Sequence, residues 1–455
     1  MHISKIKSLR EKYPTFVYNS YHWEIKDHVF EAGWDFVSGD IQYHPQLIIH
    51  LDQDVTQQNQ VSLDSLVFHL GLAEIFSYWK ATISPQIIIK AGQLSPEQIS
   101  WWEKLHLHGM GQFFYENDIV DFVNSFHWTS NSTIQHSDLP SFTPNDTNLV
   151  LLGGGKDSVV TAQLLKEHQQ PIVGFSLNST PAVSRISQDL SLKVITATRT
   201  IDPSLIVLNQ IGYLNGHVPF SAYLAFTGTL VAYLYGLKSV IVSNEASAEE
   251  ENVVYQDFKI NHQYSKTLNF EQDFQHYFTK YLSPNIEYFS FLRPLYELQI
   301  AGIFSRYPQF FSSFRSCNVG QKTDTWCGNC AKCLSIYLLL GSFLSLSTMQ
   351  SLFGQNVLDN PTLLPIFKAM IEVGQTRPFE CIGTRNETII STNLILQKCS
   401  GELPILIEYF KQDFLTSNPQ NLNVSSHALL NHFGVHSMPG IFETILKQAL
   451  PIELQ

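Results

Sequence analysis

Three consecutive glycines between a short apolar strand and a helix constrain this chain more than any other feature. Residues 148–152 read Asn-Leu-Val-Leu-Leu, Gly153, Gly154 and Gly155 follow, and residues 157–168 have a helical pattern. Glycines at such a turn let the backbone approach a ligand and direct several N–H groups at one point. Because this point also lies at the positive end of the helix, we expect it to bind an anion.

The spacing of its glycines separates this loop from two other phosphate-binding loops. A Walker A element needs Gly-x-x-x-x-Gly-Lys-Ser/Thr and a dinucleotide loop needs Gly-x-Gly-x-x-Gly, and positions 153–158 fit neither. We expect the backbone N–H groups of residues 153–158, Lys156 included, and the Ser158 hydroxyl to hold the phosphates of a nucleotide. Asp157 is predicted to contact Mg²⁺ or Mn²⁺ among those phosphates, with a helix-capping carboxylate as the alternative.

Strand-like and helix-like segments alternate after the loop. Short apolar runs at 172–177, 193–197 and 239–243 predict strands, and residues 221–235 predict a long apolar helix. Such alternation is typical of an α/β protein with a doubly wound parallel sheet, which binds ligands where its strand order reverses.

Changes in sequence texture divide the chain into three predicted domains. Residues 1–140 mix strand and helix patterns and predict an α+β domain. The Pro-, Ser- and Asp-rich stretch 137–147 indicates a linker. Residues 145–345 are expected to form the doubly wound domain, and residues 346–455 a mostly helical one.

Composition limits the class of protein. With 28 basic and 40 acidic residues the chain has a formal charge of −12, which disfavours nucleic-acid binding that depends on Lys and Arg. The amino terminus lacks the apolar segment of a secretory signal, and the uncharged runs 218–237 and 334–357 are too polar for membrane spans. We therefore expect a cytoplasmic protein with no nucleic-acid or membrane partner.

Four of the six cysteines crowd into one short segment. Cys317, Cys327, Cys330 and Cys333 follow the pattern Cys-x9-Cys-x2-Cys-x2-Cys. Four thiolates with two tight steps suit tetrahedral Zn²⁺ without an open coordination position, and such a site is structural. Buried free thiols or a redox pair are the alternatives.

Three polar residues are candidates for binding the ligand of this sheet, two because of their position and one because of its side chain. Asn244 and Glu245 follow the predicted strand 239–243, and Glu245 is expected to bind metal or substrate. Arg293 would clamp a carboxylate with two hydrogen bonds, or else form a surface ion pair.

The glycine loop resembles the pyrophosphate-binding loop (PP-loop) of the N-type ATP pyrophosphatases, whose usual form is Ser-Gly-Gly-x-Asp-Ser. Gly154, Gly155, Asp157 and Ser158 match this form, and Gly153 replaces the leading serine. The four-cysteine run is similar to that of 7-cyano-7-deazaguanine synthase, another N-type ATP pyrophosphatase. The resemblance implies an adenine nucleotide α-hydrolase-like fold.

Segments along most of the chain resemble the bacterial UDP-N-acetyl-α-D-muramoyl-L-alanyl-L-glutamate epimerases of the MurL family. They lie at 78–81, 109–115, 215–222, 243–247, 261–266, 293–295 and 378–384. The resemblance implies that ATP, with Mg²⁺ or Mn²⁺, activates the terminal L-glutamate of UDP-MurNAc-L-Ala-L-Glu as an acyl-adenylate. The epimerase then inverts that residue to D-glutamate and releases AMP and diphosphate, in peptidoglycan precursor synthesis.

The same segments supply candidates for the site. His262, Lys266 and Cys381 are candidates for moving the α-proton, alongside Asp157 and Glu245 as catalytic residues. His217, a further proton-transfer candidate, is expected to bind the substrate together with Asn244 and Arg293.

Three other functions remain as alternatives at this point. The first is an ATP-dependent, amide-forming synthase similar to 7-cyano-7-deazaguanine synthase, although a compact synthase does not need the residues before the loop. The second is a tRNA-thiolating or RNA-binding protein built on the same loop, which the acidic charge and the lack of a basic patch with aromatic residues disfavour. The third is a non-catalytic nucleotide sensor.

Overall fold

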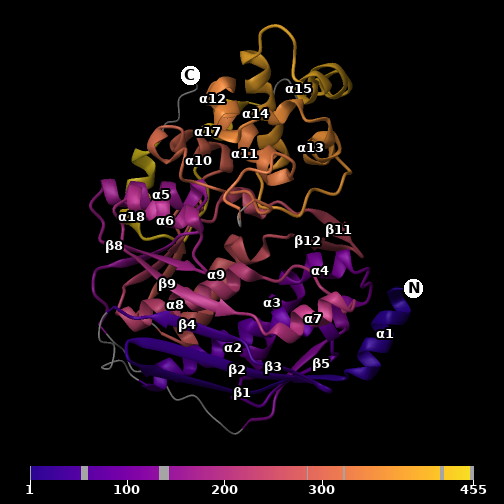
Figure 1. Ribbon diagram of the computed structural model, residues 1–455, viewed down its shortest axis with the longest axis vertical. Coiled ribbons are helices and arrows are strands. Elements are labelled where there is room, and N and C mark those ends of the chain that lie inside the picture. Colours follow the sequence, from indigo (N-terminus) through magenta and orange to yellow (C-terminus); the bar gives the residue numbers. More distant parts are fainter. Residues whose placement is uncertain are drawn as a thin grey trace.

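One large mixed sheet with helices on both sides forms the framework of the computed structural model (Figure 1). The structure describes residues 2–52, 60–132, 143–283, 285–320, 323–420 and 425–450. Much of the predicted linker at 137–147 lies outside these ranges.

The first part of the chain supplies an antiparallel meander, extended at one edge by two strands that run parallel to their neighbours. Its elements are α1 (His2–Lys12), β1 (Thr15–Lys26), β2 (Val29–Ser38), β3 (Ile41–Tyr43), β4 (Gln46–His50), α2 (Gln60–Thr82), β5 (Gln86–Ile89), α3 (Pro96–Gly109), α4 (Gly111–Glu116) and β6 (His127–Ser130). Burial alternates along β4, with Leu47 and Ile49 fully buried and their neighbours partly exposed. One face of this meander therefore packs on the core, as is common for antiparallel sheets.

The middle of the chain builds the parallel half of the sheet. Its main elements are β7 (Asn148–Leu151), α5 (Lys156–Glu167), β8 (Ile172–Leu177), α6 (Pro181–Asp189), β9 (Val194–Thr200), α7 (Pro203–Gln210), α8 (Phe220–Tyr235), β10 (Ser239–Val242), α9 (Leu268–Tyr281) and β13 (Glu287–Ser290). A small hairpin of β11 (Val253–Tyr255) and β12 (Phe258–Ile260) lies apart. Five strands are parallel in the order β13-β10-β7-β8-β9, so the order reverses between β7 and β10.

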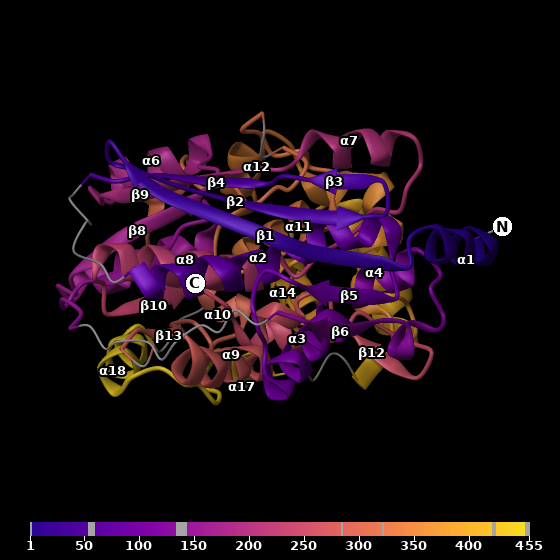
Figure 2. The same ribbon diagram turned by 90° about the horizontal axis from the view of Figure 1, so that it is seen from below.

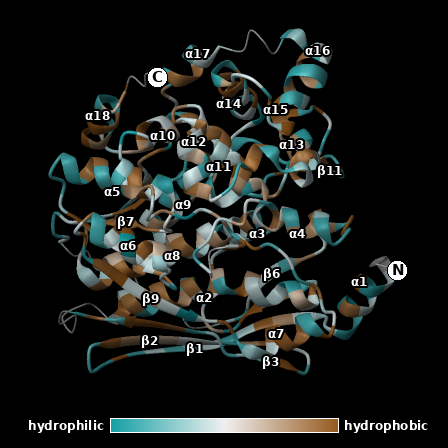
Figure 3. Cartoon of the chain, turned by 45° about the horizontal axis from the view of Figure 1, so that its top comes forward, coloured by the Kyte–Doolittle hydropathy of each residue, from teal (hydrophilic) through white to brown (hydrophobic). Residues whose placement is uncertain are grey.

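Both faces of this half of the sheet are covered, and side chains that alternate along each strand pack on both sides. Leu149 and Val240 belong to a core that contains α2, α8 and α9, whereas Val150 and Ile241 belong to a core that contains α5 and α10 (Glu297–Phe304). Adjacent residues of a strand point to opposite faces, so each strand feeds both cores. Figure 3 shows mainly apolar residues on the strands at the centre of the molecule.

The sheet crosses the predicted boundary at residue 140. Strand β4 pairs antiparallel with β9, with Ile48 opposite Thr198. Figure 2 shows β1, β2, β4, β9 and β8 side by side in this continuous sheet. Residues from both sides of this boundary thus belong to one sheet and to the core that contains α2, α8 and α9. The division of the chain into three domains stays a prediction.

The last part of the chain is helical, as predicted from its sequence. It comprises α11 (Ala331–Gly341), α12 (Leu346–Phe353), α13 (Leu364–Ile371), α14 (Arg385–Lys398), α15 (Ile405–Tyr409), a π-helical turn (Phe410–Phe414), α16 (Leu415–Ser417), α17 (Ser426–Leu430) and α18 (Gly440–Gln448). In Figure 1 most of these helices form the upper layer, above the sheet.

The apolar helix α8 is almost wholly buried. Its Thr227 side chain is satisfied within the helix, since Thr227 Oγ1 donates to the Tyr223 carbonyl at 2.8 Å. Within the described ranges, no helix has both the length and the apolarity that a membrane crossing requires.

Candidate active site

A cavity of about 280 Å³ opens at the carboxyl ends of β7 and β10. This is the point where the strand order reverses, which is where open α/β sheets bind their ligands. The cavity brings together predicted site residues from five separate segments of the chain. Its lining includes Gly153, Gly155, Asp157, Ser158, Asn244, Lys266, Arg315, Cys317, Lys332 and Cys381.

The glycine loop forms one wall of the cavity and ends at the amino terminus of α5. Gly154 has a φ of 86°, and a Cβ at this position would lie 3.1 Å from Ala182 Cβ. Among the described residues, no side chain caps the first turn of α5 at Gly155. The backbone N–H groups of this first turn are therefore free to bind an anion. The Ser158 Oγ atom donates to the Gly155 carbonyl at 3.0 Å.

Three carboxylates lie beneath the loop. Oxygen atoms of Asp157, Glu245 and Glu297 all lie within 4.8 Å of one another. The buried Lys156 ammonium donates to both Asp157 and Glu297. Burial by itself would lower the pKa of Lys156, but the two carboxylates outweigh burial and raise it, so this lysine is a fixed positive charge.

The third carboxylate of this cluster has a different environment. Within the described part of the chain, Glu245 Oε1 is buried and has no hydrogen-bond partner. Burial raises the pKa of Glu245 against the opposing effect of Lys266. A buried acceptor without a partner is costly unless a cation or donor occupies the site in the working protein.

Two lysines bring positive charge to the same cavity. Lys266 follows β12, and Lys332 lies in the first turn of α11 and donates to the Cys381 carbonyl. Burial would raise the pKa of Asp157, but Lys156 and then Lys332 lower it, so this carboxyl stays ionised. The site therefore holds carboxylates and cations close together, and both kinds of charge are needed to bind a metal–phosphate complex.

Cys381 lies on the cavity wall between two basic side chains. Lys266 Nζ donates to Cys381 Sγ at 3.2 Å, and His262 Nε2 lies 3.9 Å from the same sulfur atom. Burial, and next the Lys266 charge, lower the pKa of His262 to about 4. His262 is therefore a neutral imidazole at neutral pH, with a lone pair on one of its two ring nitrogens.

His217 lies behind this cluster, and it is not among the residues that line the cavity. Its ring is 4.4 Å from the His262 ring, measured between centroids. Burial lowers the pKa of His217 to about 3, with His262 as the next contribution. The structure thus joins His217 to the candidate proton-transfer groups, and its predicted contact with substrate stays a prediction.

Arg293 has a different place from the two predicted for it. It is 2% exposed, and its guanidinium donates to Glu271 Oε2 at 3.2 Å and to the carbonyls of Glu245 and Lys266. The same guanidinium also forms an ion pair with the partly exposed Glu249, whose Oε1 lies 3.4 Å away. Protein groups, and not a substrate carboxylate, therefore occupy the Arg293 side chain. We therefore move Arg293 from the substrate-binding set to the residues that hold the site together.

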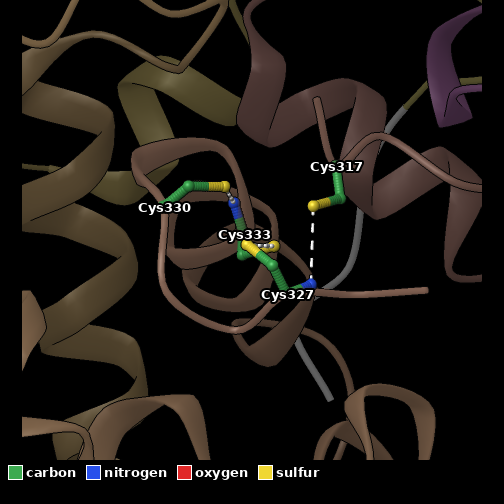
Figure 4. Close-up of side chains that lie close together, drawn as sticks. All are labelled: Cys317, Cys327, Cys330 and Cys333. Carbon is green, nitrogen blue, oxygen red and sulfur yellow. Dashed lines mark hydrogen bonds between the residues drawn. The ribbon is translucent and has the colours of Figure 1, made fainter. Parts of the chain in front are cut away.

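The four cysteines of the predicted metal site lie together beside the cavity (Figure 4). Their Sγ atoms are all within 4.8 Å of one another. Backbone N–H groups donate to three of the sulfur atoms: from Gly320 to Cys317 at 3.1 Å, from Asn329 to Cys327 at 3.5 Å and from Cys333 to Cys330 at 3.4 Å. Such donors stabilise thiolates, so the donor set fits a tetrahedral metal ion.

Sequence reasoning missed three residues of this site. Glu297 begins α10 only four positions after Arg293, and its buried carboxylate completes the acidic cluster. Lys332 lies between two candidate metal ligands, and Arg315 precedes a third by two positions. A charged side chain inside a metal-ligand motif was a usable signal for Lys332, whereas Glu297 resembled an ordinary acidic residue at a helix start.

Most of this chain is similar to known proteins of one family. The family model described as MurL N-terminal domain matches residues 7–291, and that described as MurL C-terminal domain matches residues 309–422. The relatives found include proteins named UDP-N-acetyl-alpha-D-muramoyl-L-alanyl-L-glutamate epimerase. The one from Xanthomonas oryzae pv. oryzae is 29% identical over 391 residues, which cover 84% of this chain and 85% of the relative.

Two further relatives carry the same name. The Salinispora tropica protein is 29% identical over 327 residues, or 70% of each chain. The Micromonospora protein is 28% identical over 329 residues, which cover 71% of this chain and 72% of the relative. Since the first family model alone matches more than half of the residues, this chain belongs to the MurL family.

Proposed function

We propose that this protein is an ATP-dependent epimerase that inverts the terminal L-glutamate of UDP-MurNAc-L-Ala-L-Glu to D-glutamate. Three relatives named for this epimerase activity support the substrate and the reaction. The observation that carries the proposal is a single cavity in which an uncapped glycine loop faces the Cys381–Lys266 pair. One end of the cavity suits phosphates, and the other suits a proton transfer.

Inversion of a free glutamate carboxylate needs an activating step. Removal of the α-proton beside an ionised carboxylate would create a dianion. Transfer of AMP to the carboxylate cancels its charge and leaves an acyl carbonyl that accepts the electron pair of the broken C–H bond. A proton then returns to the opposite face of the α-carbon, and hydrolysis releases AMP and the product. Stabilisation of developing charge is where enzymes gain most.

The glycine loop and its neighbours bind the nucleotide in this proposal. The N–H groups at the start of α5 and the Ser158 hydroxyl hold the phosphates that leave as diphosphate. Lys332 and Arg315 also line the cavity and balance the charge of these phosphates. This arrangement corresponds to a PP-loop, in which Gly153 takes the place of the usual serine.

The acidic cluster fits a divalent cation. Asp157 is ionised and Glu245 Oε1 lacks a partner among the described residues, so these two carboxylates would hold Mg²⁺ or Mn²⁺. When bound, the cation supplies neutralisation of phosphate charge. Lys156, which donates to Asp157 and Glu297, keeps the first of these ligands in place.

Cys381 is the group that reaches the substrate in the proton transfer. Its sulfur lies on the cavity wall, whereas His262 lies outside the lining residues. Its thiolate takes the α-proton as the C–H bond breaks and an S–H bond forms, and the Lys266 ammonium lies 3.2 Å from the sulfur. Cys381 then passes that proton to His262 Nε2, which lies 3.9 Å from the sulfur.

A structural Zn²⁺ at the four cysteines completes the proposal. Cys317 both belongs to the cysteine cluster and lines the cavity, so the metal would fix the wall that carries Arg315 and Lys332. The tetrahedral donor set leaves no open position for a substrate.

Incubation with UDP-MurNAc-L-Ala-L-Glu, ATP and Mg²⁺ tests this function through the nucleotide product. We expect AMP and diphosphate to form only when the peptide substrate is present. Formation of AMP only with ammonia and a deazaguanine acid would instead support the synthase similar to 7-cyano-7-deazaguanine synthase. An Asp157→Asn variant should lose AMP formation, since it removes the proposed metal ligand while keeping the side chain's shape.

A further inference from the structure

A chain of hydrogen bonds runs from α4 to the candidate proton-transfer groups. Gln112 Nε2 donates to Glu116 Oε1 at 2.8 Å, and Gln112 Oε1 lies 2.6 Å from His262 Nδ1. On its other side, His262 Nε2 faces Cys381 Sγ at 3.9 Å. Helix α4 comes from the first part of the chain, more than 140 residues before His262.

The chemistry of each group fixes the direction of this chain. The Glu116 carboxylate offers only acceptors, so it must receive the amide N–H of Gln112. The amide oxygen of Gln112 then faces His262 and can only accept. His262 Nδ1 must therefore carry the proton, which leaves the lone pair of Nε2 directed at the sulfur of Cys381.

We propose that Gln112, itself fixed by Glu116, is a positioning residue that holds His262 in the Nδ1–H tautomer and so makes Nε2 the proton acceptor for Cys381. This inference rests on the proposed function, and it assigns a role to the amino-terminal part of the chain. Removal of the Gln112 acceptor would free the imidazole to take the other tautomer, in which Nε2 bears a proton and cannot accept one.

The surroundings of His262 keep its imidazole neutral in the unliganded protein, so the tautomer decides which ring nitrogen carries the lone pair. The charges that face its ring are Lys266, Lys332 and Glu116, and the neutral His217 ring packs beside it. Its backbone N–H is held by Asn252 Oδ1 at 2.8 Å, which fixes the base of the side chain.

The proton step is balanced within these residues. The S–H bond of Cys381 breaks and an Nε2–H bond forms, which gives a thiolate beside the Lys266 ammonium and an imidazolium held by Gln112. The S···N distance of 3.9 Å must shorten for the transfer, as catalytic hydrogen bonds commonly do when substrate binds.

A Gln112→Met variant tests the proposal, because methionine has a similar size and cannot accept this hydrogen bond in the same way. We expect kcat for glutamate inversion to fall by roughly 10- to 100-fold, the range found when the partner that orients a histidine is removed. The KM values for ATP and peptide should change less than about twofold, because Gln112 contacts neither in the proposed site. A Gln112→Glu variant restores an acceptor and should recover part of the rate.

The tautomer itself is measured by nitrogen-15 NMR of protein labelled at histidine. The His262 signals are identified by their loss in a His262→Asn variant. We expect the Nδ1–H pattern in the wild-type protein and a mixture or the Nε2–H pattern in Gln112→Met. A Glu116→Gln variant provides an independent test, since its amide no longer dictates the orientation of Gln112 and should also weaken the Nδ1–H preference.

The matched control is Gln163→Met, because Gln163 donates to Glu167 at 2.8 Å with the same spacing on α5 but away from His262. It should leave both the rate and the His262 signals unchanged. An unaltered kcat in Gln112→Met, or an unaltered tautomer despite a lower kcat, overturns the proposal. If the wild-type protein does not invert the peptide at all, the proposed function fails, while the tautomer measurement on the unliganded protein still decides the role of Gln112.

Discussion

The three adjacent glycines of the loop differ in what they tolerate, and Gly154 is the one that the fold requires. A Gly154→Ala variant would hold alanine at a φ of 86°, which costs about 1–2 kcal/mol in the left-handed region. The new Cβ would also lie 3.1 Å from Ala182 Cβ. The peptide cannot rotate freely to relieve this contact, because the Arg315 N–H donates to the Gly154 carbonyl at 2.8 Å.

We therefore expect Gly154→Ala to lower the free energy of unfolding by about 2 kcal/mol, measured by urea denaturation with an unchanged m value. Gly153→Ala is the matched control, since a Cβ there meets no atom within 4 Å and its φ lies outside the left-handed region. It should change the stability by less than about 0.5 kcal/mol. Gly153→Ser, which restores the usual PP-loop form, should retain ATP-dependent turnover. Equal stability of the two alanine variants would refute this account of the loop.

Of three further predictions, two concern the rest of the site and one a buried lysine of α2. A Cys381→Ser variant should lose roughly 100-fold or more in exchange of the glutamate α-proton but keep ATP–diphosphate exchange, because the thiolate acts after adenylation; loss of both activities together would place Cys381 elsewhere in the mechanism. Metal analysis should find about one Zn²⁺ per wild-type chain. Cys330→Ala should lower both the zinc content and Tm, whereas Cys399→Ala, outside the cluster, should lower neither; a full zinc content in Cys330→Ala would contradict the site. Burial, with a further effect of Arg199, lowers the pKa of Lys80 to about 8. Because the unfolded chain then binds more protons between about pH 8 and 10.5, Lys80 should make stability rise with pH across this interval. The Lys80→Met variant should show a smaller rise in urea titrations, and an identical slope would exclude this contribution.

The sequence was sufficient for the parts of the fold that depend on local pattern. The predicted strands at 172–177 and 239–243 match β8 and β10 to within one residue, and the helical carboxyl-terminal region is present. The loop at 153–155 was recognisable because three adjacent glycines between a strand and a helix favour a tight turn at the positive end of that helix. The position of Asn244 at the ligand-binding edge followed from the topology of parallel sheets.

The remainder depends on contacts that a sequence does not display. Nothing before residue 140 indicated that β4 would pair with β9 and extend the parallel sheet, since pairing register is set by the fold. Arg293 and Glu271 are 22 positions apart, and only the packed structure shows that they form a buried pair. Gln112 resembles any polar residue of a short helix until its contact with His262 is known.

Incorporation of solvent deuterium at the glutamate α-carbon is the most direct test of the central claim, which is that adenylation of the peptide carboxylate precedes loss of its α-proton. The protein is incubated with UDP-MurNAc-L-Ala-L-Glu and Mg²⁺ in D₂O, and the product is analysed by NMR and chiral amino-acid analysis. We predict that deuterium and D-glutamate accumulate only when ATP is present, together with AMP. Deuterium uptake at the same rate without ATP, or AMP release without any deuterium in the peptide, would contradict it.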